Sequence, residues 1–198
     1  TSFEQSIEEL NKAIKLEPRS PEYRYQLAIV YFSLATWDQA EARLHASLEV
    51  DPYFTEAHNL LGAVLAESGD RAGALAEFQK VLADRAYATP YKVWVNIALL
   101  HEVMNNFDEA VVSYRKALDA NNGYMRAHYC LAQVLDRMGR LDEAIAEYEV
   151  AGKEYEPLPE YQYKFGLACF RAGRKLEARE HLELVVKRAP GSTDASKA

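Results

Sequence analysis

The stretch LGAVLAESGDRAGALAEF, residues 61–78, combines small and bulky apolar residues at the spacing from which the fold can be predicted. Its first small residue, Gly62, is followed twelve positions later by a second small residue, Ala74, and the bulky apolar Phe78 comes four positions after that. Gly69 lies between the two halves, at the kind of position where a left-handed residue ends a helix. The stretch therefore predicts two short helices that pack together across a tight turn.

The same pattern recurs along the whole chain. The small residue of the second half recurs at Ser6, Ala40, Ala74, Ala110, Ala144 and Ala178. The bulky residue four positions later recurs as Leu10, Leu44, Phe78, Tyr114, Tyr148 and Leu182. The small residue of the first half recurs as Ala28, Gly62, Ala98, Ala132 and Gly166. The interval is 34 residues, except between Ala74 and Ala110, where it is 36. Small residues at these places let two helices approach to about 8–10 Å.

This pattern resembles the tetratricopeptide repeat (TPR) family, whose units are helix-turn-helix pairs of about 34 residues. The resemblance implies an all-α fold, a TPR right-handed superhelical solenoid of one half repeat plus five full repeats. The predicted solenoid covers residues 1–190, with a partial repeat at 1–18 and full repeats at about 21–52, 55–86, 91–122, 125–156 and 159–190. The polar tail GSTDASKA, residues 191–198, is expected to be disordered.

Turn residues agree with these boundaries. Ser20 before Pro21, and Thr89 before Pro90, place a capping side chain in front of a proline that starts a helix. Three glycines that follow helices are expected to adopt the left-handed conformation, namely Gly69, Gly139 and Gly173. The partial repeat is a single short helix, so we expect it to depend on packing against the helix predicted at residues 23–34.

Composition and charge exclude several classes of protein. Apolar residues make up 49% of the 198 residues, and no apolar run approaches the roughly 20 residues that span a bilayer. The net charge of −7 argues against nucleic-acid binding, because contact with phosphates needs a basic face. Cys130 and Cys169 fall inside predicted helices, so two buried thiols are favoured over a structural disulfide.

A solenoid of this kind has a concave surface lined by the first helix of each unit. We predict a partner-binding groove lined by Tyr25, Ile29, Phe32, Asn59, Val95, Asn96, Leu99, Tyr129, Gln133, Tyr163, Leu167 and Phe170. Aromatic residues are favoured anchors at interfaces, so this groove would bind an extended or helical peptide with apolar side chains. Tyr129 and Tyr163 are the expected anchors, and Asn59 and Asn96 are expected to hold a peptide backbone. The alternative is that a tight superhelix buries these rings against its own helices.

No arrangement typical of catalysis occurs in the sequence. HEVMN, residues 101–105, begins like the zinc-protease motif but lacks its second histidine, so a packed His101 is favoured. His58 and His128 occupy equivalent places two repeats apart, which favours a packing role, whereas His45 and His181 are expected on the surface of second helices. We predict no enzyme activity, no catalytic residue, no cofactor and no metal site.

The two extra residues fall within DRAYATPYKVW, residues 84–94. Tyr87 either fills the widened gap there or contacts a partner, and filling is favoured because a Tyr near a helix end is usually partly buried. This junction, together with YQYKFGLACFRAGRKLEAREHL at residues 161–182, resembles the TPR lipoproteins of type IV pilus biogenesis, often called pilotins.

The second resemblance implies a lipoprotein on the periplasmic face of the outer membrane that helps the pilus secretin reach that membrane and assemble. The lipid-bearing cysteine would precede residue 1, because Cys130 and Cys169 lie within predicted helices. The implied partner is a protein or peptide, the secretin among them, and the membrane is reached only through that anchor. The alternatives are a generic TPR adaptor of another complex, which would be cytoplasmic, and the TPR segment of a larger enzyme. Self-association also stays open.

Overall fold

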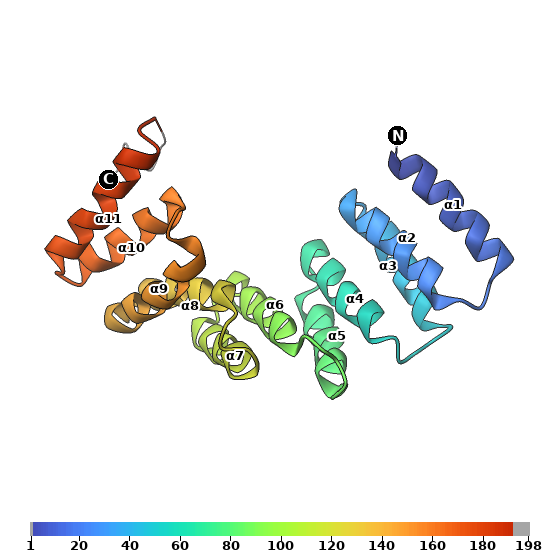
Figure 1. The fold of residues 1–198 in the computed structure, drawn as a ribbon. Coiled ribbons are helices and arrows are strands. Elements are labelled where there is room, and N and C mark those ends of the chain that lie inside the picture. The colour runs from blue at the N-terminus through green and yellow to red at the C-terminus, as the bar shows by residue number, and fades with distance from the viewer. Residues whose placement is uncertain (1, 192–198) are drawn as a thin grey trace. The chain divides into compact units, whose positions relative to one another are not determined.

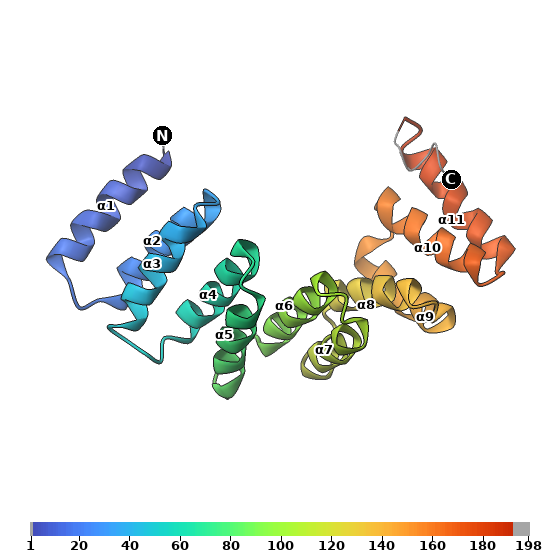
Figure 2. The same cartoon turned by 180° about the vertical axis from the view of Figure 1, so that it is seen from behind.

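The computed structural model describes residues 2–191, and this part of the chain contains eleven α-helices and no strand (Figure 1; Figure 2 gives the view from behind). The helices are α1 (Ser2–Leu16), α2 (Pro21–Ser33), α3 (Trp37–Leu48), α4 (Thr55–Ser68), α5 (Arg71–Ala83), α6 (Pro90–Val103), α7 (Phe107–Ala120), α8 (Met125–Arg137), α9 (Leu141–Tyr155), α10 (Pro159–Arg171) and α11 (Lys175–Arg188). This confirms the predicted all-α fold of helix-turn-helix repeats. The tail predicted to be disordered lies outside the described residues, apart from Gly191.

Contacts between helices divide the chain into two compact units, residues 1–97 and residues 98–198, with the boundary inside α6. In the first unit, α1 packs against α2, α2 pairs with α3, α4 pairs with α5, and α3 lies against α4. In the second unit, α8 pairs with α9 and α10 pairs with α11, while α7 lies against α8 and α9 against α10. Each hairpin therefore contacts the next one in sequence within its unit.

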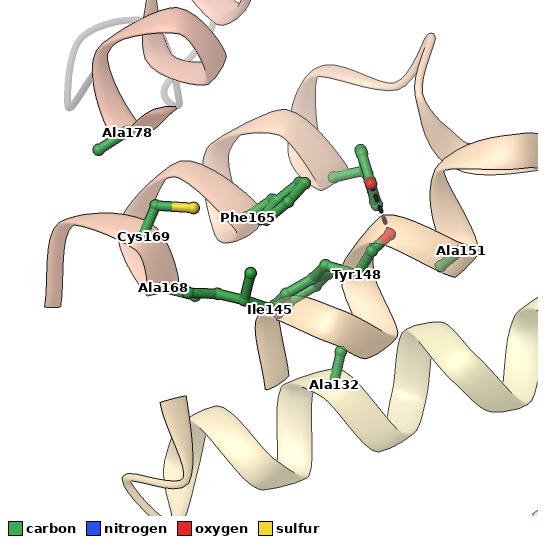
Figure 3. Close-up of a cluster of buried hydrophobic side chains, with 9 residues drawn as sticks. Ala132, Ile145, Tyr148, Ala151, Phe165, Ala168, Cys169 and Ala178 are labelled. Carbon is green, nitrogen blue, oxygen red and sulfur yellow. Dashed lines mark hydrogen bonds between the residues drawn. The ribbon is translucent and has the colours of Figure 1, made fainter. Parts of the chain in front are cut away.

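The recurring small and bulky residues meet inside the hairpins. A Cβ atom added to Gly62 would lie 2.7 Å from two ring atoms of Phe78, and one added to Gly166 would lie 2.9 Å from the Cγ of Leu182. In the second unit Ala132 of α8 points toward the buried ring of Tyr148 on α9 (Figure 3). The sixteen-residue spacing between small and bulky partner is thus a direct side-chain contact, which fixes how closely the two helices approach.

The turns inside the hairpins share one backbone feature. The predicted left-handed conformation is confirmed at the three glycines, with φ of 98° at Gly69, 75° at Gly139 and 79° at Gly173. The equivalent positions of the other two hairpins hold non-glycine residues in the same conformation, Ala35 with φ 53° and Asn105 with φ 58°. The turn geometry is therefore the same in all five hairpins, although the residue that adopts it differs.

At the helix starts, the predicted prolines have their expected positions, whereas a predicted side-chain cap is absent. Pro21 and Pro90 open α2 and α6 as predicted. The expected side-chain cap at Ser20 does not form, because its hydroxyl donates to the carboxylate of Glu22 at 2.6 Å. The carbonyl of Thr89 accepts a hydrogen bond from the backbone N–H of Lys92 at 3.0 Å, which closes the first turn of α6.

Candidate functional site

The predicted groove residues all lie on the first helix of a hairpin. They are distributed as Tyr25, Ile29 and Phe32 on α2, Asn59 on α4, Val95, Asn96 and Leu99 on α6, Tyr129 and Gln133 on α8, and Tyr163, Leu167 and Phe170 on α10. Most of them are half-buried, whereas Ile29 and Phe170 are exposed. Val95 is only 1% exposed, so its side chain is a core residue rather than a surface that a partner reaches.

In the first unit, two of the predicted groove residues contact side chains from neighbouring turns. The ring of Tyr25 lies 5.0 Å from that of Phe54, centroid to centroid. The side-chain amide of Asn59 donates to the hydroxyl of Tyr87 at 3.3 Å, and the Oδ1 of Asn59 is buried with no hydrogen-bond partner. Tyr87 is itself half-buried, as the gap-filling alternative requires. The amide expected to hold a peptide backbone is therefore occupied in part by the junction.

The expanded junction also forms a cavity of about 430 Å³ in the first unit. The hydroxyl of Thr55, at the start of α4, donates to the carboxylate of Asp84 at 2.7 Å and so ties the junction to α4. This hydrogen bond lowers the pKa of Asp84, which keeps its carboxylate ionised. Tyr87 lines the same cavity.

In the second unit the predicted anchor Tyr129 belongs to an aromatic cluster. Its ring stacks on that of Tyr155, with centroids 4.7 Å apart and planes at 21°. The rings of Tyr148 and Tyr161 lie 6.1 and 6.0 Å away. The hydroxyl of Tyr161 donates to the backbone carbonyl of Tyr148 at 2.7 Å, the dashed bond of Figure 3. Burial raises the pKa of Tyr129, so its hydroxyl stays protonated.

A lysine also lies over the ring of Tyr129. The Nζ of Lys164 lies 5.5 Å from the centre of the Tyr129 ring and donates to the Oε1 of Gln133 at 2.6 Å. An ammonium over a tyrosine ring is a favourable cation–π contact. Two of the predicted groove residues are thus joined by a third residue that the sequence reading did not select.

The predicted groove residues of α10 differ in how much of their surface is accessible. Tyr163 and Leu167 are half-buried, and Phe170 is 61% exposed. Phe170 borders a cavity of about 540 Å³ whose other apolar walls include Leu182 and Val186 of α11. Phe170 therefore lies near the end of α10 and faces α11.

Charged pairs that the sequence reading missed connect successive hairpins of the second unit. Arg171 donates to both carboxylate oxygens of Asp136, at 2.8 and 2.7 Å. Arg137 lies 3.3 Å from the carboxylate of Glu102, which also accepts a hydrogen bond from the hydroxyl of Tyr114 at 2.6 Å. In both pairs the arginine comes 35 residues after the acid. That repeated offset is a signal that could have revealed them.

The histidines also follow the repeat. His58 contacts Glu77, and His128 contacts Glu147, which supports the packing role predicted for both. His181 is a correction, because it is half-buried rather than a surface residue and its ring lies 4.0 Å from that of Phe165. Burial lowers the pKa of His181.

The remaining chemistry of the chain is limited. Cys130 is half-buried and Cys169 is buried, and both are free thiols; burial raises the pKa of Cys169 to about 11. Within residues 2–191, no three His, Cys, Asp or Glu side chains come together in a way that could hold a metal ion. None of the helices in that range is both long and apolar enough to cross a membrane.

Known repeat families match most of the chain. Tetratricopeptide repeat models match residues 25–89 and 104–164, and a TPR repeat model matches residues 2–34. These models describe repeats and no enzyme domain. No curated protein matches the chain.

Several solved structures have the same fold over nearly their whole length. PilW, described as a widely conserved type IV pilus biogenesis factor, is 22% identical with a TM-score of 0.88, over 98% of this chain and 90% of that one. PilF of Pseudomonas aeruginosa is 18% identical with a TM-score of 0.86, over 99% and 88%. YrrB, described as a TPR protein with an unusual peptide-binding site, is 18% identical with a TM-score of 0.74, over 95% and 96%. At these identities the likeness shows the fold alone.

Proposed function

This chain belongs to the tetratricopeptide repeat family, whose members are scaffolds that bind proteins or peptides, and from that premise we propose that it is a pilotin-like factor of the type IV pilus. In this role it assists outer-membrane assembly of the pilus secretin. The observation that carries the proposal is the likeness to PilW, which extends over 98% of this chain and 90% of that one. The proposed location is the periplasmic face of the outer membrane.

The proposed binding surface is the accessible part of the first-helix stripe. In the second unit Tyr163, Leu167 and Tyr129 are all half-buried, but Tyr129 is stacked on Tyr155 and covered by Lys164. An apolar peptide or helix of the partner would bury the first two side chains, and buried aromatic anchors contribute most to such interfaces. In this proposal Tyr129, whose ring is packed against that of Tyr155, is not one of the anchors.

The test is calorimetry of this chain with the periplasmic and C-terminal segments of a type IV pilus secretin from the same genome. The variant Tyr163→Ala/Leu167→Ala is expected to weaken binding by about tenfold or more, since loss of each of the two anchors costs over ~1 kcal/mol and ~1.4 kcal/mol corresponds to a tenfold change in affinity. The matched control is Val112→Ala, because Val112 is 52% exposed on α7, the second helix of its hairpin.

Each outcome separates the parts of the proposal. Absence of binding by the unmodified chain would reject the pilotin role and leave a generic adaptor, to be followed by a pull-down. Binding that the double variant retains in full would keep the role and reject the groove. Equal losses in the double variant and in Val112→Ala would also reject the groove as the specific site.

A further inference from the structure

A buried histidine joins the two helices of the α4–α5 hairpin. The Nδ1 of His58 lies 2.5 Å from the carboxylate of Glu77, and its Nε2 lies 3.0 Å from the backbone carbonyl of Pro52. The two side chains are only 11% and 12% exposed. Both ring nitrogens of His58 therefore face a hydrogen-bond acceptor, away from water.

The α8–α9 hairpin repeats this geometry seventy residues later. The Nδ1 of His128 lies 2.5 Å from the carboxylate of Glu147, and its Nε2 lies 3.0 Å from the backbone carbonyl of Asn122. The distances equal those of the first pair, and the His128 side chain is 12% exposed. The arrangement is thus built into the repeat rather than confined to one site.

The number of protons follows from the acceptors. A neutral imidazole carries one N–H and can donate to one acceptor only, whereas an imidazolium donates from both nitrogens. A backbone carbonyl cannot supply a proton, so the second proton must lie between the ring and the carboxylate. From this geometry we propose that the His58–Glu77 and His128–Glu147 pairs are two proton-binding sites, each holding an imidazolium against a carboxylate in the folded chain.

The charge on the acid agrees with this assignment. Burial acts to raise the pKa of Glu77, but the hydrogen bonds from Lys80 and His58 outweigh it and lower that pKa. Glu77 is then ionised, and the proton belongs to the ring. The other titratable groups beside His58 are Asp84 and Tyr53, which line the same cavity.

The second pair lacks the neighbouring lysine that the first pair has. The position equivalent to Lys80 is Val150, so the Glu147 carboxylate has His128 as its ion-pair partner among the described residues. The two pairs therefore differ in the neighbouring cation but share the contact itself.

The last hairpin makes the same connection without the extra proton. The side-chain amide of Gln162 donates to the carbonyl of Glu156 at 2.7 Å, and its Oε1 faces the Nδ1 of His181 at 2.6 Å. An amide carries both a donor and an acceptor, so a neutral histidine satisfies it. Gln162 and His181 occupy the columns of His58 and Glu77 and provide an internal control for the proposal.

The direction of the pH effect follows from the proton count. If each pair holds one proton more in the folded chain than its two side chains hold after unfolding, the stability that this proton contributes falls as the pH rises. The hairpins α4–α5 and α8–α9 are thus weakened by alkali rather than by mild acid.

The experiment replaces each histidine–glutamate pair by the glutamine–histidine pair that the last hairpin uses. The double variants are His58→Gln/Glu77→His and His128→Gln/Glu147→His. Long-range ¹H–¹⁵N correlation spectra of the unmodified chain at pH 7.5 should show both ring nitrogens of His58 and His128 protonated. Urea unfolding between pH 6 and pH 9 should show a loss of stability on the alkaline side that shrinks in each double variant and disappears when both exchanges are combined.

Two results would overturn the proposal. One is a single protonated ring nitrogen in His58 and His128 at pH 7.5, and the other is an alkaline loss that the combined exchange leaves unchanged. If an exchange prevents folding, Glu77→Gln and Glu147→Gln replace it, because each keeps the histidine and supplies a neutral partner. Each should then show one protonated ring nitrogen in a folded chain, and retention of two would reject the imidazolium–carboxylate assignment.

Discussion

At the scale of single residues, a left-handed turn position that holds a residue other than glycine is under backbone strain. Ala35 and Asn105 adopt at φ 53° and 58° the conformation that glycine adopts in the other hairpins. An L-residue pays about 1–2 kcal/mol in this region, and asparagine tolerates it better than alanine because its side chain bonds locally. Ala35 is therefore the strained member of the set.

Replacing Ala35 with glycine is expected to stabilise the chain by about 0.5–1 kcal/mol, because relief of strain exceeds the added entropy of the unfolded state. The measurement is thermal unfolding, where such a gain raises Tm by a few degrees at most. The reverse change, Gly69→Ala, serves as the control and should lower Tm. A lower Tm for Ala35→Gly would mean that the turn does not need this conformation.

His181 supplies a second expectation at this scale. Burial lowers its pKa below the unfolded value of about 6.5, so the folded chain disfavours the charged ring. Below that value the unfolded state binds more protons, and stability falls as the pH falls. Urea unfolding at pH 7.5 and 5.5 should show a smaller acid loss in His181→Gln than in the unmodified chain. An identical acid loss would show that His181 does not contribute to it.

The sequence predicts on which helices the groove residues lie, but not how far each of their side chains is covered. The stripe was predictable, since helical periodicity places its residues on first helices. The burial of Val95 and the stacking of Tyr129 were not, because they depend on which neighbouring side chains cover them. Tyr155 and Lys164, which cover Tyr129, come from a second helix and from the next hairpin.

At the scale of helices, the contact between a small and a bulky residue sets the spacing inside each hairpin. Gly62 leaves no room for a Cβ beside Phe78, at 2.7 Å. This pairing was fully predictable from the chain, since both partners recur at fixed intervals. The histidine–glutamate pairs recur equally regularly, yet only the histidines stand out in the sequence, because glutamates are also common on helix surfaces.

Gly62→Ala is expected to lower the free energy of unfolding, because overpacking costs about 1–3 kcal/mol and outweighs the gain in helix propensity of up to ~1 kcal/mol. In the background of Phe78→Leu, which makes room for the added methyl, the same change should become neutral or stabilising. Chemical denaturation of the four chains measures this cycle. The same destabilisation in both backgrounds would show that the two residues do not limit each other.

At the scale of the whole molecule, burial is uneven along the array. Within the first unit α1 has no buried residue, whereas α4 has six. Within the second unit α11 has two and α8 has six. In repeat proteins stability is close to a sum of local terms, so the helices with few buried residues open more readily than the rest.

Since α10 also has six buried residues, native-state hydrogen exchange should show the weakest protection in α1 and α11, and the strongest in α4, α8 and α10. Protection that is uniform along the chain would instead mean that it unfolds in one cooperative step. The binding partner is a different matter at this scale, because repeat spacing fixes a scaffold and leaves the chemistry of its ligand to a few surface side chains.

The two extra residues of the chain have a consequence for how such arrays can be recombined. From each left-handed turn residue to the small residue that follows, the interval is five in every hairpin, at residues 35–40, 69–74, 105–110, 139–144 and 173–178. All variation in the spacing of these positions is confined to the connection after α5, which the hydrogen bond from Thr55 to Asp84 joins to the start of α4. A whole hairpin could therefore be exchanged as a unit. A graft joined within this connection would change the spacing between successive hairpins and would leave the contacts between small and bulky residues inside each hairpin unchanged.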